Sequence, residues 1–551
     1  MINPAIYFHS EAYSIDGPKL MGRNAAGESF IRGFFKHSKS KEFWIQVERA
    51  EHAKSFSDLA LKNARSEKIN VVTKSNLSAL SQAGVIYFPG PGIGEHAFHR
   101  SKLGHAAWSL CGITHTTSSA GAMDALVDLI TAPIQSWDAL ICTSNAVKAN
   151  VACVLQAQID YLKDRLGITK MVLPQMPVIP LGIHTEDFDF SPDQKHAARQ
   201  ELGVAQDAIV VLFMGRLSFH AKAHPLAMYQ ALQKAKLATG KDIVLIECGW
   251  YANDSIEKAF DAAAQLACPD VRVIKLDGRL SAHRQRVWAG ADIFCSLSDN
   301  IQETFGIVPI EAMAAGLPVV VSDWDGYKDT VREGVDGFKI PTTLPAQNLG
   351  EDLALRHALG IDTYDMYCGH NCMFVAVDVE RTAQAFVQLF ESKALREQMG
   401  QAGKTRAQEV FDWSQVIAQY ERLWQECSDL RQLNKGLSAT PTHAWPARLN
   451  PFFAFSGYST DALALDTLLT LIDSDVDSAL QRFRAYRALM MLDFAKYVLP
   501  SEEEVGLLFK GFFNANASPA QVLGQFAAER QAFVFRCIVW LLKMGLLRVV
   551  R

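Results

Sequence analysis

The sequence predicts an α/β protein in which two doubly wound parallel sheets follow one another and face a common cleft, with a mostly helical domain after them. Over the first 180 residues, short apolar runs alternate with helix-length segments. This alternation indicates a parallel sheet covered on both faces. The same alternation starts again after about residue 200, and after about residue 345 the apolar positions follow helical spacing instead.

The predicted strands of the first sheet are residues 5–9, 43–48, 69–73, 85–89, 112–116, 139–144 and 177–181. Those of the second sheet are residues 208–215, 242–249, 271–276, 292–298 and 318–323. Open α/β sheets bind their ligands beyond the carboxyl ends of the strands. We therefore expect the chemistry to lie in the cleft between the two sheets.

Changes in composition divide the chain into three predicted domains. The first spans 1–180 and the second 181–432, joined by the polar, charged segment 178–194. A polar linker containing proline follows at 433–451. Residues 452–551 then form an accessory helical domain, in which an amphipathic helix, a glycine and a β-branched run also fit a small winged-helix-like module.

Composition excludes several classes of protein. Of the 551 residues, 49% are apolar and 21% charged, which is typical of soluble globular proteins and excludes long disorder and fibrous repeats. The 54 Lys and Arg against 59 Asp and Glu give a formal charge of -5, which argues against nucleic acid as a partner. The N-terminal segment lacks the pattern of a signal peptide and no apolar run is long enough to span a membrane, so we expect a cytoplasmic location.

The cysteines do not indicate a disulfide framework, because ten of them are scattered over 551 residues. The close pair Cys368 and Cys372, with His370 between them, resembles part of a zinc site. A structural zinc site needs a second pair of ligands. None follows nearby in the sequence, so we expect no metal.

The segment 298–342 carries the strongest chemical signal. It begins at the end of a predicted strand, and a helix is expected to start between Phe305 and Ile307. Pro309 fits there because the first turn of a helix has no use for its missing N–H. Gly316 is expected to end the helix, and Pro318 to prevent its continuation.

The start of this helix is a predicted anion site, because the first amides of a helix have no partner within it. The amides expected to point into the cleft belong to Thr304, Phe305, Gly306 and Ile307.

Two glutamates lie on either side of this helix start. Helical rise places Glu311 roughly 8–10 Å along from the loop that holds Glu303, too far for both to bind one metal or share one proton. A ligand with hydroxyls at both ends and phosphates between them would satisfy both carboxylates and the amides, and a nucleotide sugar has this layout. The alternative is that Glu303 caps the helix and Glu311 is an exposed helical residue.

A second predicted anion site follows the first strand of the second sheet, in MGRLSFHAKAHP (214–225). Gly215 lets the backbone turn, Arg216 can grip a phosphate with its planar guanidinium, and Lys222 adds a mobile charge. Two such cations would offset the charge of a departing diphosphate. The alternative is that both are ordinary surface charges.

Two features of the first domain are weaker candidates. Gly22 and Gly27 lie in a predicted loop, before a helix expected to start near Glu28, where the backbone could approach an anion. His115 ends the predicted strand 112–116 at the cleft, where it could bind a sugar hydroxyl or move a proton. A purely structural histidine is the alternative.

Residues 5–425 resemble glycosyltransferase family 4, retaining enzymes of the GT-B fold with two Rossmann-like domains. The most specific part is ETFGIVPIEAMAAGLPVVVSDWDGYKDTV, with two glutamates separated by seven residues. GRLSFHAK resembles the Arg/Lys diphosphate site of the family, with one residue more than usual between the two cations. VIPLGIHTEDF resembles the family linker, with Leu181 and His184 at positions where Asn and Asp are usual. Residues 408–425 resemble the terminal helix that crosses back onto the first domain.

The resemblance implies a role for each candidate residue. Glu303 would hold hydroxyls of the donor sugar, and Glu311 the ribose. Diphosphate and sugar contacts would come from Arg216, Lys222, Gly215, Gly27, His115 and the amides of Thr304, Phe305 and Gly306. The base would meet main-chain groups near Gly249 and from Lys275 to Gly278.

The implied reaction is transfer of a hexose-type sugar with retention, in which the leaving diphosphate takes the acceptor proton on the same face. It requires no enzyme nucleophile, metal or other cofactor, and closure of the two domains would exclude water. The acceptor stays open between a carbohydrate, a lipid-linked molecule and a protein. Membrane-surface contact, self-association and partner binding stay open for the last domain.

Two other classes of function remain. The first is a nucleotide-sugar epimerase or a sugar phosphorylase on the same fold, although no convincing pyridoxal-binding lysine occurs late in the chain. The second is a catalytically silent binding or scaffold protein.

Overall fold

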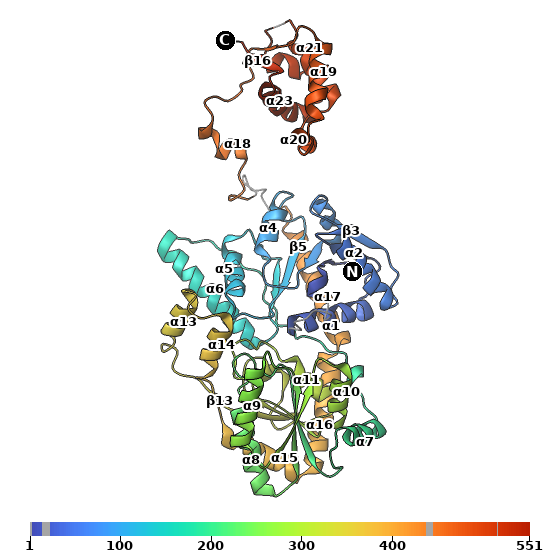
Figure 1. Cartoon of the computed structure of the whole chain (residues 1–551), viewed down its shortest axis with the longest axis vertical. Helices are drawn as coiled ribbons and strands as arrows, with labels where there is room; N and C mark the ends of the chain where they lie inside the picture. The colour runs from blue at the N-terminus through green and yellow to red at the C-terminus, as the bar shows by residue number, and fades with distance from the viewer. Residues whose placement is uncertain (1–2, 14–21, 437–444, 515, 551) are drawn as a thin grey trace. The chain divides into compact units, whose positions relative to one another are not determined.

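The structure is a computed structural model that describes residues 3–13, 22–436, 445–514 and 516–550. It divides into two compact units, Met1–Trp445 and Pro446–Arg551. Figure 1 shows both units, and each is described by itself below.

The first unit contains two parallel sheets, as the sequence predicts. Each has six strands, whereas the sequence predicts seven for the first sheet and five for the second, because 177–181 is not a strand and β12 is not predicted. The first sheet has the order β3-β2-β1-β4-β5-β6. Its strands are β1 (Ala5–Tyr7), β2 (Phe43–Gln46), β3 (Ile69–Val72), β4 (Val85–Tyr87), β5 (Ser109–Ile113) and β6 (Ala139–Ile141). The helices around it are η1 (Ser10–Ala12), α1 (Gly22–His37), α2 (Ala50–Lys62), η2 (Leu77–Ala79), α3 (Leu80–Ala83), α4 (Gly94–Ser101), α5 (Ala120–Thr131), α6 (Asn145–Leu166) and η3 (Thr185–Phe188).

The second sheet has the order β12-β11-β10-β7-β8-β9, so β7 lies at its centre between β10 and β8. Its strands are β7 (Ile209–Met214), β8 (Ile243–Gly249), β9 (Arg272–Asp277), β10 (Ile293–Ser296), β11 (Val319–Ser322) and β12 (Gly337–Ile340). Its helices are α7 (Pro192–Glu201), α8 (Leu226–Thr239), α9 (Asp254–Ala267), α10 (Ser281–Gly290), α11 (Ile307–Ala314), α12 (Tyr327–Thr330), α15 (Val379–Glu391) and α16 (Lys393–Arg406). A short hairpin of β13 (Thr342–Thr343) and β14 (Ala376–Val377) carries α13 (Glu351–Ala358) and α14 (Tyr364–Cys372).

Two predictions about the first domain are wrong, one about a strand and one about the start of a helix. Residues 177–181 form no strand, because Val178 makes only an isolated bridge to Cys142. The prolines at 177 and 180 each lack the N–H that a ladder would need. The helix expected near Glu28 begins earlier, at Gly22.

The chain returns from the second domain to the first through the short π-helix η4 (Ala407–Phe411) and the long helix α17 (Trp413–Leu433). Ile183 of the linker exchanges backbone hydrogen bonds with Phe411 and Trp413, so the outgoing and returning segments lie side by side. The Trp413 indole donates to the Ser29 hydroxyl (2.8 Å). Tyr420 then packs against Phe30 of α1. The terminal helix therefore joins the core of the first domain.

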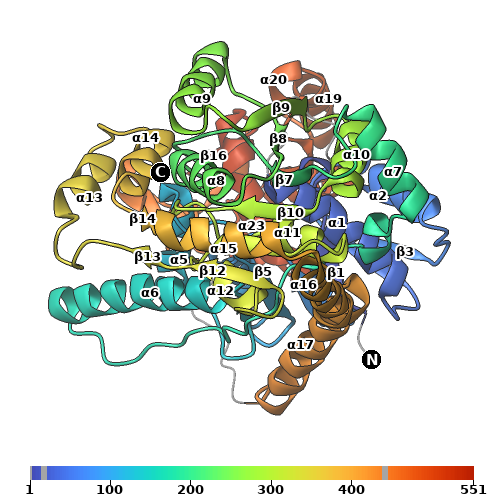
Figure 2. The same cartoon turned by 90° about the horizontal axis from the view of Figure 1, so that it is seen from below.

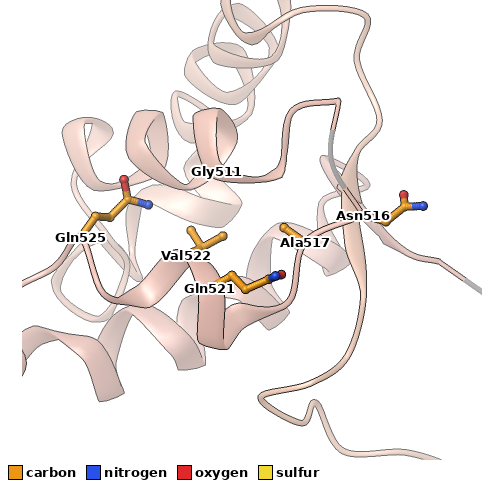
Figure 3. Close-up of a pocket in the computed structure, with 6 residues that line it drawn as sticks. All are labelled: Gly511, Asn516, Ala517, Gln521, Val522 and Gln525. Atoms are coloured by element: carbon orange, nitrogen blue, oxygen red, sulfur yellow. The ribbon is translucent and has the colours of Figure 1, made fainter.

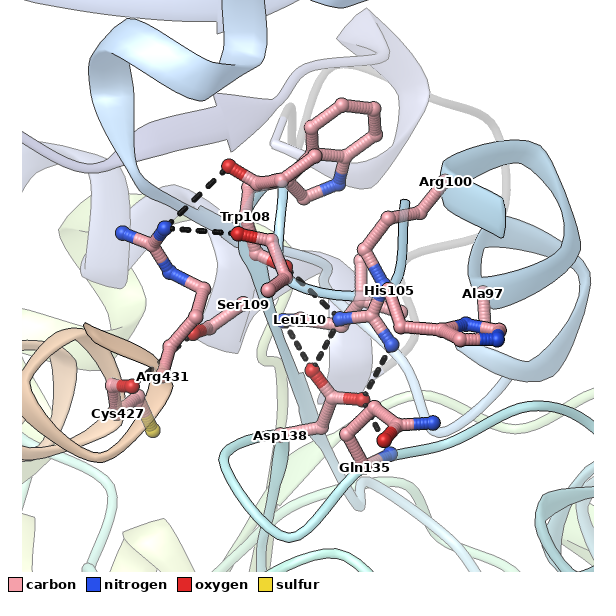
Figure 4. Close-up of polar contacts among 12 residues, drawn as sticks. Ala97, Arg100, His105, Trp108, Ser109, Leu110, Gln135, Asp138, Cys427 and Arg431 are labelled. Carbon is pink, nitrogen blue, oxygen red and sulfur yellow. Dashed lines mark hydrogen bonds and ion pairs between the residues drawn. The ribbon is translucent and has the colours of Figure 1, made fainter. Parts of the chain in front are cut away.

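A buried ion pair stiffens the region where α17 ends. The side chains of Arg100 and Asp138 are fully buried, and their Nη1 and Oδ1 atoms lie 2.6 Å apart. Asp138 also accepts the Leu110 amide (2.8 Å). Arg431 of α17 donates to the Ala106 carbonyl (3.1 Å), and Ser109 donates to the Cys427 carbonyl (3.1 Å). Figure 4 shows these contacts joining α17 to the strand β5 and its neighbours.

The second unit is mostly helical, with one two-stranded antiparallel sheet of β15 and β16. Its elements are α18 (Pro451–Ala454), η5 (Ser456–Tyr458), β15 (Leu469–Leu471), α19 (Val476–Arg487), α20 (Met490–Asp493), η6 (Lys496–Val498), α21 (Glu502–Phe512), α22 (Pro519–Leu523), α23 (Ala528–Lys543) and β16 (Leu547–Val549). The winged-helix comparison stays a prediction. Part of the predicted linker, residues 437–444, lies outside the described residues.

Candidate functional site

Three glycines end three neighbouring strands of the second sheet and form a flat backbone surface. Gly215 follows β7, Gly249 ends β8 and Gly278 follows β9. A Cβ on Gly249 would lie 1.9 Å from the Gly215 carbonyl oxygen, and one on Gly278 would lie 2.9 Å from the Gly249 Cα. Only glycine permits this approach. The structure thus brings together Gly215 and Gly278, which the sequence predicts separately, at the carboxyl edge of the sheet.

The centre of the site is an ion pair between Lys222 and Glu303. The Lys222 ammonium is bonded to Oε2 of Glu303, and the two side chains are 20% and 12% exposed. Lys222 lies in the loop between β7 and α8, and Glu303 in the loop between β10 and α11. Because β7 and β10 are neighbours in the sheet, their loops meet. The sequence predicts both residues as ligand contacts but does not indicate that they bind each other.

This pair keeps both groups charged. Burial by itself would raise the pKa of Glu303, but the Lys222 ammonium and the amides of Thr304 and Phe305 outweigh it and lower that pKa. Burial would likewise lower the pKa of Lys222, but the charge of Glu303 raises it. A charged, preorganised pair therefore lies at the start of α11.

The helix α11 begins at Ile307 and Pro309 lies in its first turn, as predicted. Gly306 has a φ of +81°, and a Cβ there would lie 1.9 Å from Cε1 of Tyr327. The Tyr327 hydroxyl is bonded to the Ser296 hydroxyl (2.9 Å), which holds the ring against the glycine. Gly306 is therefore required both for its backbone angle and for space.

One expectation about the helix start is wrong. The Thr304 amide is not free, because it donates to Oε1 of Glu303 (3.3 Å). The carboxylate of the preceding residue reaches this N–H, although no side chain caps α11 itself, whose N-cap is Gly306. Ligand binding at this end of α11 therefore has to share or displace the Glu303 carboxylate.

Glu311 lies in different surroundings from Glu303. Its side chain is half-buried, so it is not a simple exposed helical residue. Burial raises the pKa of Glu311 to about 7, although the charges of Arg284 and Lys222 oppose the shift. Arg284 in turn donates to the Gly278 carbonyl (2.9 Å). The Arg284 charge that acts on Glu311 is thus anchored next to the glycine surface.

Arg216 is held by two acceptors in this structure. Its Nη2 atom donates to the Ala221 carbonyl (2.8 Å) and to Oε1 of Gln302 (2.7 Å). The Gln302 amide nitrogen donates in turn to the Tyr364 hydroxyl (3.1 Å). Gln302 is not among the predicted site residues, although it directly precedes Glu303. Tyr364 is not among them either, because no local pattern indicates it.

The first domain contacts the site through the loops after β5 and β6. The Thr304 hydroxyl donates to the His115 carbonyl (2.7 Å), and the Ser144 hydroxyl donates to the Thr304 carbonyl (2.9 Å). β5 ends at Ile113, so His115 lies beyond the strand end rather than at it. The backbone of His115 therefore lies next to Thr304, and the role of its side chain stays a prediction.

The prediction that Gly22 and Gly27 lie in a loop of the first domain is wrong, because both belong to α1. Gly27 lies inside α1, and a Cβ there would lie 2.0 Å from the Ala12 carbonyl oxygen. The glycine lets η1 pack closely on α1. Leu20 and Met21, which begin the predicted loop, lie outside the described residues. A donor contact by Gly27 stays a prediction.

Asp325 is a further acidic residue that sequence analysis missed. It has a positive φ of +44°, and its Oδ1 lies 3.4 Å from the Ser144 hydroxyl. Burial, together with the nearby charge of Glu303, raises the pKa of Asp325 to about 8. Its place in the WDG sequence after β11 suggests a turn, but nothing local indicates that the turn carries an acid next to Glu303.

Within the described residues, no group of three or more His, Cys, Asp or Glu side chains is placed to hold a metal ion. Cys368 and Cys372 are buried. Between them, His370 is paired with Asp362, with Nδ1 and Oδ2 3.0 Å apart.

A hollow of about 460 Å³ lies in the second unit. Figure 3 shows its lining of small and amide side chains: Gly511, Asn516, Ala517, Gln521, Val522 and Gln525. It holds no acid, base or nucleophile among these residues. The reactive groups therefore point to the cleft of the first unit as the functional site.

Residues 194–355 match the family described as glycosyl transferases group 1. The match covers less than half of the chain. The matched segment contains Arg216, Lys222, Glu303 and Glu311. The family resemblance predicted from these residues is therefore confirmed.

Curated relatives match about a third of the chain. A D-inositol 3-phosphate glycosyltransferase of Geodermatophilus obscurus is 34% identical over 31% of this chain and 37% of its own length. A lipopolysaccharide 1,2-N-acetylglucosaminetransferase of Salmonella typhimurium is 25% identical over 32% of this chain and 46% of its own length. The chain thus spans less than half the length of these relatives.

The two facing sheets have the GT-B arrangement, as predicted. The structure of HepE from Anabaena in complex with UDP and glucose is similar with a TM-score of 0.50, at 16% identity, over 77% of this chain and 99% of HepE. At this identity the likeness shows the fold. In the part of the chain that the structure describes, no helix is both long and apolar enough to cross a membrane.

Proposed function

We propose that the chain is a retaining glycosyltransferase that moves a hexose-type sugar from a nucleoside-diphosphate sugar to a hydroxyl acceptor. The observation that carries this proposal is the Lys222–Glu303 pair at the start of α11, next to Arg216 and the glycine surface, inside the segment that matches group 1 glycosyl transferases. The carboxylate suits sugar hydroxyls, and the two cations suit a diphosphate.

Binding of the donor would rearrange the charges already present. A diphosphate next to Lys222 attracts the ammonium that now holds Glu303, so the carboxylate is released toward hydroxyls of the sugar. Gly215, Gly249 and Gly278 leave room for the nucleotide against the sheet edge. Glu311, in the middle of α11, would bind the ribose hydroxyls.

The transfer step follows from this placement. The acceptor oxygen bonds to the anomeric carbon on the face from which the diphosphate departs, and a diphosphate oxygen takes the acceptor proton. Arg216, Lys222 and the dipole of α11 offset the charge of the leaving group. These groups supply the neutralisation that a metal ion provides in other enzymes, so we propose a reaction that is independent of metal.

The relatives suggest the class of donor to try first. The HepE structure holds UDP and glucose, and a relative in Salmonella is named for the transfer of N-acetylglucosamine. We therefore propose a nucleoside-diphosphate hexose as donor, with UDP-sugars as the first candidates. The acceptor is a carbohydrate, lipid-linked or protein hydroxyl.

The domain boundaries at 180, 432 and 451, a cytoplasmic location and a binding role for the last domain are parts of the same proposal. Support for the last comes from apolar side chains that the second unit exposes. Met490 is 89% exposed, Phe494 81% and Tyr497 86%.

The test is a thermal-shift panel of UDP, GDP, ADP and CMP sugars, followed by incubation of the stabilising donor with and without acceptor mixtures. Transfer with retained anomeric configuration, insensitive to EDTA, is the expected result. An isomerised donor in the absence of acceptor indicates an epimerase, and a phosphate-dependent sugar release indicates a phosphorylase. Absence of any nucleotide binding would contradict the proposal and favour a scaffold protein.

A further inference from the structure

The hairpin of β13 and β14 carries a helical pair, α13 and α14, which is not part of either sheet. Figures 1 and 2 place this pair on the side of the second domain opposite to α7 and α10. From there α14 reaches the loop of the first domain that follows β5. The first residue of α14, Tyr364, makes the contact.

The Tyr364 hydroxyl joins three segments of the chain. Its oxygen lies 2.9 Å from the Ser118 hydroxyl and 3.4 Å from the Thr116 hydroxyl, both in the first domain. It also accepts a hydrogen bond from the Gln302 amide nitrogen (3.1 Å). The carbonyl oxygen of the same Gln302 side chain accepts from Arg216 (2.7 Å). One phenol thus links the first domain to Arg216 through a single amide.

The helix α14, which begins with Tyr364, packs against the loop that carries Arg216 and Lys222. Gly369 of α14 packs on His220, with room for no Cβ because that atom would lie 2.9 Å from the Cβ of His220. The Cys372 thiol lies 3.6 Å from the Phe219 carbonyl oxygen. At the start of the helix, the Thr363 hydroxyl accepts the Met366 amide (3.3 Å). α14 is therefore packed on the second domain, and its Tyr364 hydroxyl extends to the first.

The helices α13 and α14 are held to each other by Asp362, which pairs with Arg356 and His370. Arg356 of α13 and His370 of α14 are both paired with Asp362, at 2.7 Å and 3.0 Å. The carboxylate of Asp362 is fully buried. The two helices of the pair are held together at the turn that leads into Tyr364, so the phenol does not depend on a free loop for its position.

We propose that Tyr364 is a positioning residue that couples closure of the two domains to the orientation of Arg216. When the domains are closed, the phenol is held by Ser118 and Thr116 and in turn fixes the Gln302 amide, so that the carbonyl oxygen of Gln302 faces the guanidinium. When they open, the phenol loses its partners in the first domain, and Gln302 and Arg216 lose part of their orientation. The coupling rests on the proposed function for its purpose, which is to make diphosphate binding strongest when water is excluded.

The experiment compares three variants of the full chain. Tyr364→Phe removes the hydroxyl and keeps the ring. Ser118→Ala removes a partner in the first domain and leaves the Tyr364–Gln302 bond in place. Tyr367→Phe is the matched control, because Tyr367 lies on the same helix and its ring stacks on His357 (4.1 Å between ring centroids).

The first readout is amide hydrogen exchange over residues 114–125, measured without nucleotide. We expect Tyr364→Phe and Ser118→Ala to exchange several-fold faster there than wild type, and Tyr367→Phe to match wild type. The second readout is the Kd for the nucleoside diphosphate that the thermal-shift panel selects, measured by calorimetry. Loss of hydrogen bonds of ordinary strength predicts a Kd about threefold to tenfold higher in Tyr364→Phe. Ser118→Ala should raise the Kd by a smaller factor, because the bond to Gln302 is kept but its link to the first domain is weakened.

Equal exchange and equal Kd in Tyr364→Phe and Tyr367→Phe would overturn the coupling. A Kd in Ser118→Ala equal to that of wild type would overturn the link between the first-domain contact and Arg216. If wild type binds no nucleoside diphosphate, the proposed function fails, and the exchange measurement alone then decides whether Tyr364 holds the two domains together.

Discussion

Lys222 and Glu303 lie 81 positions apart in the sequence, yet the ammonium of one is bonded to the carboxylate of the other at the start of α11. The loops that carry them follow β7 and β10, which are neighbours in the second sheet. The pair holds an acid and a cation ready at the place where we propose that sugar and diphosphate meet. Each group also keeps the other in its charged form.

Replacement of Glu303 by Gln should abolish transfer while the fold is kept. The amide keeps the size of the side chain but loses the charge that binds Lys222 and the sugar hydroxyls. Loss of such a preorganised group typically costs about 10²–10³ in kcat. A sugar-transfer assay measures the loss, with circular dichroism as the check on folding. The control is Glu380→Gln, which breaks an exposed pair with Lys234; wild-type turnover in Glu303→Gln would remove Glu303 from the reaction.

Replacement of Arg216 by Ala should weaken binding of the free nucleoside diphosphate by about tenfold or more, because a charged hydrogen bond contributes about 1.5–3 kcal/mol. Isothermal calorimetry measures the Kd. Arg381, an exposed residue of α15 whose guanidinium lies near Gln384, offers a control with the same charge change. An unchanged Kd in Arg216→Ala would place the diphosphate elsewhere.

Glu311 should make the protein less stable as the pH rises from 5 to 7. Burial raises its pKa to about 7, so the folded chain keeps a proton there that the unfolded chain, with a pKa near 4.5, has lost. Stability falls with pH wherever the folded state binds more protons. From these two values the loss between pH 5 and pH 7 is about 2 kcal/mol. Urea unfolding of wild type and Glu311→Gln at both pH values measures it, and the difference between the two proteins should shift by this amount. An equal pH dependence in both would show that Glu311 does not hold the proton.

Replacement of Asp138 by Asn should destabilise the first unit. It leaves the Arg100 guanidinium buried without its charged partner (Figure 4). Breaking one side of a buried pair typically costs about 3–5 kcal/mol. Urea unfolding followed by circular dichroism measures the change in the free energy of unfolding. The matched variant is Asp160→Asn, whose exposed pair with Lys163 should matter far less; similar losses in both would mean that the buried pair adds little.

A shortened chain of residues 1–445 should keep the nucleotide affinity of the full chain. All the proposed donor contacts lie in the first unit, which is compact without the second. Trp445 is kept because its ring stacks on Phe98, with 5.2 Å between ring centroids. Calorimetry on both chains measures the Kd. A large loss of affinity would assign part of the donor site to residues 446–551.

Local patterns in the sequence were sufficient for most strands of both sheets and for the start of α11, but not for β12. Apolar runs, Pro309 and Gly316 act through their immediate neighbours, so their effect can be predicted without knowing the fold. The same patterns do not show where a glycine is needed for close packing. Gly27 looks like a loop glycine, but it lies within a helix, where the absence of a Cβ makes room for the Ala12 carbonyl.

The sequence by itself determined the two-sheet architecture, the two glutamates at α11 and the cations after β7, because each is written in a short continuous stretch. Only the tertiary structure decided that Lys222 binds Glu303, that Glu303 takes the Thr304 amide, and that Tyr364 links Ser118 to Gln302. These contacts depend on which strands are neighbours and on where an inserted helix packs. That order is set by the burial of whole faces of the sheet, and no single segment contains it.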